Sequence, residues 1–243
     1  MKTVAVILAA GKGVRMKSEL PKVSHSIFGK PMIVWVLEAV GGLQLDEVFV
    51  VVGYKADVVR SECEGFNITF VEQKEQLGTG HAVAQAAPYI KDSIVLVLNG
   101  DMPLIKADTL KEFIAWHLKN RSASATILTA TLPDPASYGR IVRDSEGRVI
   151  RIVEKKDATE DELGIKEINT GTYCFNSRAL FEALDEVRPD NAQKEYYLTD
   201  VIEIFAKRNL PVYAYKAQDP NEVLGVNTIE ELARLEQLFK NAS

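Results

Sequence analysis

Short apolar runs alternate with amphipathic stretches through the first half of the chain. The runs predict strands at 3–8, 47–52, 68–72, 94–98 and 125–131. The stretches between them predict helices near 32–41, 56–64, 79–87 and 107–120. Runs such as 48–52 and 94–98 are continuous rather than alternating, which is typical of strands that are covered on both faces. The pattern therefore predicts an α/β domain with a doubly wound, mostly parallel sheet.

After about residue 132 the pattern changes. Residues 141–150 hold a turn-forming centre between two β-rich arms and predict a hairpin, and the mixed stretch 157–166 is expected to be a mobile loop. The elements predicted after it are a strand at 168–175, helices at 177–187 and 197–208, and a strand at 212–215. Thr228 and Glu231 have capping-box spacing and predict the start of a last helix. We expect one domain at 1–227 followed by a C-terminal helix at 228–243.

The first predicted strand ends in a loop that carries two glycines and several cations. Gly11 and Gly13 let the backbone turn and approach a ligand closely, so that consecutive N–H groups point at one anionic group. Lys12, Arg15 and Lys22 follow within eleven residues of Gly11. The loop is neither a Walker A loop nor a complete dinucleotide fingerprint. It favours polyphosphate binding, and a glycine-rich turn with solvated lysines is the open alternative.

Charge is unevenly distributed along the chain. The net charge is −5, of which residues 1–37 contribute +5 and the remainder −10. An acidic protein that concentrates positive charge near one loop fits a bound anion better than nucleic acid, although a merely solvated face remains open. We therefore expect no nucleic-acid partner.

Length and cysteine usage indicate the class of protein. A chain of 243 residues, 47% of them hydrophobic, is long enough to bury a large core. Cys63 and Cys174 lie far apart and match no metal-ligand spacing, so we expect two reduced, buried thiols and no disulfide. No apolar run approaches the length of a membrane span. These features predict a cytoplasmic protein without a membrane partner.

A second polar segment follows a predicted strand at Asn99-Gly100-Asp101. Ligands of such sheets bind outside the carboxyl ends of the strands, so Asp101 is expected in the same crevice as the glycine loop. Mg²⁺ uses one or two carboxylates and takes its other oxygens from water and phosphates, so one Asp beside a polyphosphate is sufficient. The open alternative is a turn or a helix N-cap.

Several motifs now occur together in one order. They are Leu8-Ala-Ala-Gly-Lys-Gly-x-Arg-Met16, Pro21-Lys22, Gln76-Leu-Gly-Thr-Gly-His-Ala82, Gly100-Asp101, Tyr138-Gly-Arg140, Glu167-Ile-Asn-Thr-Gly171, Asn191-Ala-Gln-x-Glu-Tyr-Tyr-Leu-Thr-Asp200 and Gly225-Val-Asn227. Over nearly the whole chain they resemble the uridylyltransferase domain of bifunctional N-acetylglucosamine-1-phosphate uridylyltransferase/glucosamine-1-phosphate acetyltransferase. The first motif belongs to sugar nucleotidyltransferases in general, whereas 76–82 and 191–200 are more particular to this subgroup.

The resemblance implies a Rossmann-like nucleotidyltransferase fold with an inserted β-hairpin sugar-binding region. It implies that UTP and N-acetylglucosamine 1-phosphate give UDP-N-acetylglucosamine, a peptidoglycan precursor, and pyrophosphate with Mg²⁺. It places Arg15 and Lys22 on the phosphates and Asp101 and Asn227 on the metal. The implied nucleotide residues are Leu8, Ala9, Ala10 and Gly11, with Gln73, Gly78 and Thr79 on the uracil. Gly13, Asn99 and Gly100 are further implied substrate-binding residues, with Asn99 near the ribose or the sugar. The implied sugar residues are Gly139, Glu154, Asn169 and Thr170.

The chemistry of the residues agrees with these roles. A sugar phosphate has a second pKa of about 6 and is mostly dianionic at neutral pH, so it needs alignment and charge neutralisation rather than a general base. We therefore expect His25, His81 and His117 to be structural. The amide of Gln73 matches the donor and acceptor edge of uracil. Glu154 suits two sugar hydroxyls, although from the residues alone an ion pair with Lys155 or Lys156 is favoured.

The sequence also departs from the family. Val14 stands where Thr is usual, Asn99 where Tyr is frequent and Lys194 where Gly is common. No hexapeptide repeats are present, so we expect no β-helix domain and infer neither the acetyltransferase nor its trimer. The remaining alternatives are a related enzyme that uses another sugar 1-phosphate or dTTP, and a sugar-nucleotide sensor without catalysis.

Overall fold

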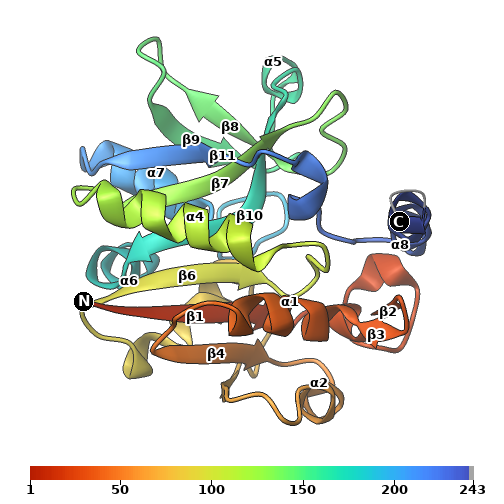
Figure 1. Ribbon diagram of the computed structural model, residues 1–243. Helices are drawn as coiled ribbons and strands as arrows, with labels where there is room; N and C mark the ends of the chain where they lie inside the picture. Colours follow the sequence, from red (N-terminus) through yellow and green to blue (C-terminus); the bar gives the residue numbers. More distant parts are fainter. Residues whose placement is uncertain (241–243) are drawn as a thin grey trace.

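The computed structural model describes residues 1–240, with side chains described as far as Gln237, so the last three residues of the predicted helix 228–243 lie outside the described part. A sheet of nine strands forms the centre of the molecule, with the main order β11-β7-β10-β6-β1-β4-β5 (Figure 1). The seven strands of this main order are β1 (Lys2–Ala9), β4 (Glu47–Val52), β5 (Thr69–Glu72), β6 (Ser93–Asn99), β7 (Ala125–Thr131), β10 (Glu167–Asn176) and β11 (Val212–Lys216).

Most of this main path is parallel. The strands of the pairs β1/β4, β1/β6, β4/β5 and β7/β11 run parallel, and β10 lies antiparallel between β6 and β7. In register, Leu8 on β1 lies opposite Asn99 on β6, so the glycine loop and the 99–101 segment leave the sheet side by side. The predicted α/β fold with a mostly parallel sheet is confirmed.

Helices cover both faces of the sheet, which explains the continuous apolar runs. One face carries α1 (Met32–Gly41), α2 (Ala56–Glu62) and α4 (Ala107–Lys119), and the other carries α3 (Thr79–Ala84), α6 (Ser177–Leu184) and α7 (Asp200–Lys207). In β1, Ala5 and Ile7 belong to the hydrophobic core under α1, α2 and α4, whereas Val4 and Val6 belong to the core under α3, α6 and α7. Because the side chains on both faces of the strand are buried, apolar residues follow one another without alternating with polar ones.

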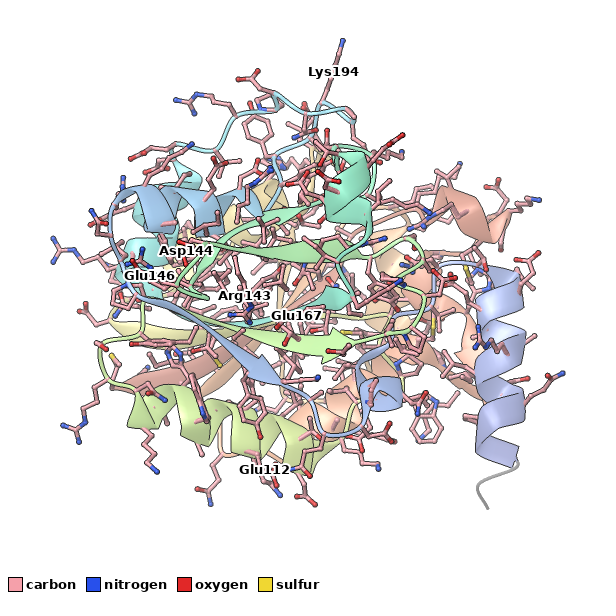
Figure 2. All side chains as sticks on the ribbon, turned by 90° about the horizontal axis from the view of Figure 1, so that it is seen from above. Glu112, Arg143, Asp144, Glu146, Glu167 and Lys194 are labelled. Carbon is pink, nitrogen blue, oxygen red and sulfur yellow. The ribbon has the colours of Figure 1, made fainter. Side chains whose placement is uncertain are left out.

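The predicted hairpin is formed by β8 (Gly139–Arg143) and β9 (Val149–Val153), and β8 pairs with β10. Arg143 and Glu167 join the hairpin to β10 by an ion pair of 2.8 Å (Figure 2). The expectation of a loop without secondary structure at 157–166 is wrong, since it contains α5 (Glu160–Leu163). Thr159 and Glu162 form a capping box there, and that local signal was present in the sequence.

The region between the glycine loop and α1 holds structure that the pattern did not predict. The 3₁₀ turns η3 (Ala87–Tyr89) and η4 (Pro220–Val223) lie elsewhere in the chain, whereas this region holds the 3₁₀ turns η1 (Val14–Met16) and η2 (Lys22–Ser24) and a small hairpin of strands β2 (Ser26–Ile27) and β3 (Lys30–Pro31). The last helix, α8 (Ile229–Lys240), begins after Thr228 as predicted and packs Leu232 and Leu235 against this region. Over the described residues, we find no helix that is both long and apolar enough to traverse a lipid bilayer.

Candidate active site

A cleft of about 340 Å³ opens where β1 and β6 end. This is the edge of an open α/β sheet at which ligands bind. The predicted residues that line it are Leu8, Ala9, Gly11, Arg15, Lys22, Thr79, Asn99, Asp101, Gly139, Glu154, Asn169, Thr170 and Asn227. The predicted residues outside this lining are Ala10, Gly13, Gln73, Gly78 and Gly100. The structure thus gathers most of the predicted set, which comes from widely separated segments of the sequence, around one cavity.

The loop after β1 folds back on itself at Gly13. This residue has φ +69°, and a Cβ atom there would lie 2.5 Å from Cβ of Lys22. A side chain at position 13 is therefore excluded by both the backbone conformation and the space. The close approach brings Lys22, at the start of η2, beside Arg15 of η1. Glycine at this position is what allows the two cations to share the cleft.

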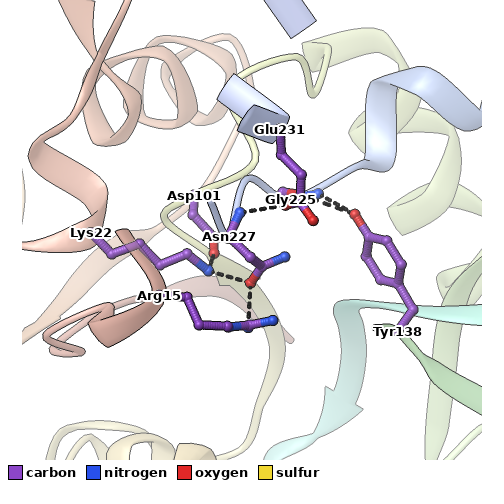
Figure 3. Close-up of polar contacts among 7 residues, drawn as sticks. All are labelled: Arg15, Lys22, Asp101, Tyr138, Gly225, Asn227 and Glu231. Carbon is purple, nitrogen blue, oxygen red and sulfur yellow. Dashed lines mark hydrogen bonds and ion pairs between the residues drawn. The ribbon is translucent and has the colours of Figure 1, made fainter. Parts of the chain in front are cut away.

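Arg15, Lys22, Asp101 and Asn227 form a connected polar cluster at the cleft (Figure 3). Lys22 makes an ion pair with Asp101 and donates to Oδ1 of Asn227 at 2.7 Å. Arg15 donates to the same Oδ1 at 2.8 Å. The side chains of Lys22 and Asp101 are only 18% and 12% exposed. The Lys22–Asp101 pair is therefore shielded from water, which strengthens its electrostatic interaction, whereas Arg15 is exposed.

Asn227 is held in place by its own segment and by Glu231 and Tyr138, neither of which was predicted as a site residue. The backbone N–H of Val226 donates to the carbonyl of Asp101 at 2.9 Å, and the N–H of Asn227 donates to Oε2 of Glu231 at 2.7 Å. The hydroxyl of Tyr138 accepts from the N–H of Gly225 at 2.9 Å and donates to its carbonyl at 3.1 Å. Burial raises the pKa of Tyr138, so the hydroxyl keeps its proton for that contact. The motifs 138–140 and 225–227 were the available signal.

The wall formed by β10 carries a bulge between Asn169 and Thr172. Such a bulge redirects side chains toward a site. Oδ1 of Asn169 accepts from the N–H of Gly171 at 3.1 Å, and the residue lines the cleft. The hydroxyl of Thr170 donates to the carbonyl of Leu128 at 2.7 Å, so this side chain stabilises the bulge.

Glu154 lies at the end of β9 and lines the cleft, and its carboxylate has no hydrogen-bond or ion-pair partner among the described residues. Burial raises its pKa to about 7. Three further carboxylates add to the rise, those of Asp157, Asp200 and Glu195, and the guanidinium of Arg140 opposes it. Of the two interpretations left open by the sequence, an ion pair with a neighbouring lysine is therefore not what the structure contains.

The segment 73–81 reaches the cleft through Thr79. The hydroxyl of Thr79 accepts from the N–H of Leu198 at 3.0 Å, and Gly80 donates to the carbonyl of Tyr196 at 2.8 Å. Gln73 is 3% exposed and donates to the carbonyl of Gly78 at 3.0 Å. The motifs 76–82 and 191–200 lie far apart in the sequence, and these hydrogen bonds join them in the structure.

The cleft offers a metal ion two protein oxygen ligands, one from Asp101 and one from Asn227. Among the described residues no group of three or more His, Cys, Asp or Glu side chains is placed to bind one. Asp101 and Oδ1 of Asn227 instead converge on the Lys22 ammonium, where a cation of the protein stands in for the charge of a metal. Two oxygens at one point, with space for phosphates and water, is a donor set that fits Mg²⁺.

A protein-family model described as nucleotidyl transferase matches residues 4–221. The chain belongs to the nucleotidyl transferase family. It is 50% identical over 238 residues to a protein from Brevibacillus brevis named bifunctional protein GlmU, covering 97% of this chain and 51% of that protein. It is 51% identical over 242 residues to the protein of the same name from a Geobacillus species, covering 99% of this chain and 52% of that protein. The resemblance drawn from the motifs is confirmed, and the chain spans about half the length of these curated relatives.

Two solved structures share the fold of this chain. One is a UDP-glucose pyrophosphorylase complexed with UDP-glucose, with a TM-score of 0.78, 19% identity and full coverage of both chains. Another is HddC from Yersinia pseudotuberculosis complexed with GMP-PN, with a TM-score of 0.72, 24% identity and coverage of 98% of this chain and 100% of that one. At these identities the likeness establishes the architecture of the nucleotidyl transferase fold.

The three departures from the family pattern lie in different surroundings. Val14 is 77% exposed. Lys194 has φ +55°, a conformation that glycine adopts freely, and its side chain projects away from the molecule (Figure 2). Asn99 lines the cleft beside Gly171, where a Cβ atom would lie 2.1 Å from its amide nitrogen. Of the three, Asn99 is the one placed to alter the cleft itself.

Proposed function

We propose that this protein transfers a uridylyl group from UTP to N-acetylglucosamine 1-phosphate, forming UDP-N-acetylglucosamine and pyrophosphate. The proposal is supported by about half-identical relatives named bifunctional protein GlmU and by the nucleotidyl transferase family. The observation that carries it is the connected cluster of Arg15, Lys22, Asp101 and Asn227 at the carboxyl ends of the central strands, with the Lys22–Asp101 pair largely buried. We assign the reaction to the cytoplasm and the product to peptidoglycan synthesis.

The reaction brings two anions together. The phosphate of the sugar attacks the α-phosphorus of UTP, and pyrophosphate leaves with the electron pair of the broken P–O bond. Catalysis of such a step consists of alignment and of neutralising charge. Arg15 and Lys22 supply two positive charges at the loop that follows β1, and the backbone of 8–11 approaches the nucleotide. No described group in this cleft needs to act as a general base.

The sugar is assigned to the wall formed by β8, β9 and β10. The amide nitrogen of Asn169 donates to a sugar oxygen, and Glu154 contacts sugar hydroxyls as an unpartnered carboxyl group. Gly139 leaves room next to Glu154, since a Cβ atom there would lie 3.3 Å from Oε1. In this assignment Thr170 acts mainly by stabilising the bulge that aims Asn169.

We assign Mg²⁺ to Asp101 and Asn227, whose oxygens already converge on one cationic group. When bound, the ion neutralises phosphate charge. Lys22 then moves its positive charge from Asp101 toward the phosphates. Glu231 and Tyr138 keep Asn227 and its segment in position, whichever cation is present.

The test is release of pyrophosphate by the purified protein from UTP and N-acetylglucosamine 1-phosphate with Mg²⁺. Turnover that requires both substrates supports the proposal. A matrix of UTP, dTTP, CTP and ATP against several sugar 1-phosphates decides the pair, and a clear preference for another pair replaces the assigned substrates. Tight UDP-N-acetylglucosamine binding without turnover for any pair supports the sensor and contradicts the enzyme.

A further inference from the structure

The carboxamide of Gln73 is fixed on one side by two contacts. Its Nε2 donates to the carbonyl of Gly78 at 3.0 Å and lies 3.0 Å from Nδ1 of His81. A carbonyl oxygen only accepts hydrogen bonds, so the atom that faces Gly78 is the nitrogen of the amide. Both hydrogens of Nε2 are thereby used inside the protein, and the side chain is 3% exposed.

His81 must accept in this arrangement. Nε2 of Gln73 offers hydrogens and no lone pair, so Nδ1 of His81 is the acceptor in this contact. The ring is positioned by the first turns of α3 and by Tyr196, whose ring centroid lies 6.4 Å away. His81 therefore acts together with the carbonyl of Gly78 to hold the amide nitrogen of Gln73 on this side.

Only the carboxamide oxygen of Gln73 remains for a ligand, since it has no partner among the described residues. We propose that His81 is a positioning residue that sets base selectivity by presenting this oxygen, and not the NH₂ group, to the nucleotide. This inference rests on the proposed function, in which Gln73 reads the base. A pyrimidine with an N–H at ring position 3, such as uracil or thymine, donates to the oxygen. Cytosine has a lone pair there and is rejected.

Two substitutions at one position test this inference. His81→Leu removes the acceptor and keeps an apolar side chain of moderate size. His81→Asn keeps an acceptor oxygen on the atom that corresponds to Cγ of histidine. We expect the wild-type protein to prefer UTP to CTP in kcat/KM by about 100-fold or more. We expect His81→Leu to reduce that preference by about 10-fold and His81→Asn to retain most of it.

A merely structural role predicts a different result. If His81 only packs the segment 76–81, His81→Leu lowers kcat/KM for UTP and CTP by the same factor, and His81→Asn gives no rescue; either result overturns the inference. Thermal unfolding of each variant separates loss of fold from loss of selectivity. If the wild-type protein turns over no sugar phosphate, the proposed function fails. The calorimetric affinity ratio of UTP to CTP in the three proteins then still decides the role of His81.

Discussion

The ammonium group of Lys22 contacts the carboxylate of Asp101 in a site that lies largely away from solvent. The same ammonium donates to Asn227, so a cation of the protein occupies the point where two oxygen ligands meet. A buried cation and a buried carboxylate stabilise each other, and removing either leaves the other uncompensated. Binding a polyphosphate with a divalent ion offers each of them a new partner.

Loss of either member of this pair is expected to reduce turnover. We expect Lys22→Ala and Asp101→Ala each to lower kcat by about 100-fold or more, the scale of losing one preorganised electrostatic contact. Arg15→Lys is also expected to be costly, because a planar guanidinium is exchanged for a point charge. Pyrophosphate release measures all three. Lys2→Ala is the control, since it breaks a Lys–Glu pair of 3.0 Å at the other end of β1; near-normal rates for Lys22→Ala and Asp101→Ala would contradict the assignment.

The same pair predicts an effect on metal affinity without nucleotide. Lys22→Ala removes a positive charge that competes for Asp101 and Asn227, so Mn²⁺ is expected to bind about 10-fold or more tightly in this variant. Electron paramagnetic resonance titration of free Mn²⁺ measures the change. Asp101→Ala is expected to abolish the gain in the double variant, and Lys2→Ala to leave the affinity unchanged. Unaltered Mn²⁺ binding in Lys22→Ala would place the metal elsewhere.

Sequence reasoning predicted the sheet well because its strands are covered on both faces. Continuous apolar runs such as 94–98 occur where α helices bury each side, and that pattern does not depend on distant residues. Helix ends were predicted less well: α3 ends at Ala84 and α6 at Leu184, each three residues earlier than expected. The hairpin of β2 and β3 was missed since strands of two residues have no periodicity to detect.

Only those site residues that belong to sequence motifs could be predicted. Arg15, Lys22 and Asp101 follow strands in the sequence, so their convergence follows from the fold. The contact between Asn227 and Glu231 could not be predicted, because the capping-box spacing pairs Glu231 with Thr228. In the structure the carboxylate of Glu231 accepts instead from the N–H of Asn227. The partnership of Gln73 and His81 depends on the path of the segment between them, which local pattern does not define.

Stability is expected to fall as pH rises through the range in which Glu154 ionises. In the unfolded chain this carboxyl titrates near its ordinary value, and in the folded protein burial raises its pKa to about 7. Between these values the folded state holds the extra proton, so the free energy of unfolding decreases with rising pH. Glu154→Gln removes this loss. We expect the variant to gain about 2 kcal/mol relative to wild type on going from about pH 5.5 to about pH 8.

Urea unfolding at the two pH values measures that gain. Glu162→Gln is the matched control, because the capping contact with the N–H of Thr159 holds the pKa of Glu162 below its ordinary value. A group of that kind adds stability above its unfolded pKa and loses it only at lower pH, so its variant should differ from wild type equally at both values. If Glu154→Gln also differs equally, the carboxyl of Glu154 is not the group that titrates.

Two glycines with positive φ separate backbone strain from steric exclusion. Gly78 has φ +117°, and a Cβ atom there would lie 2.6 Å from the carbonyl oxygen of Tyr196; Gly65 has φ +89° and open space around it. We expect Gly65→Ala to lower the free energy of unfolding by about 1 kcal/mol, from strain alone. Gly78→Ala is expected to cost about 3 kcal/mol or more, since backbone must also move. It should further raise KM for UTP, because the displaced segment carries Thr79. If urea unfolding shows equal losses of stability for Gly65→Ala and Gly78→Ala, the segment 76–80 can shift away from Tyr196 without a further cost in free energy.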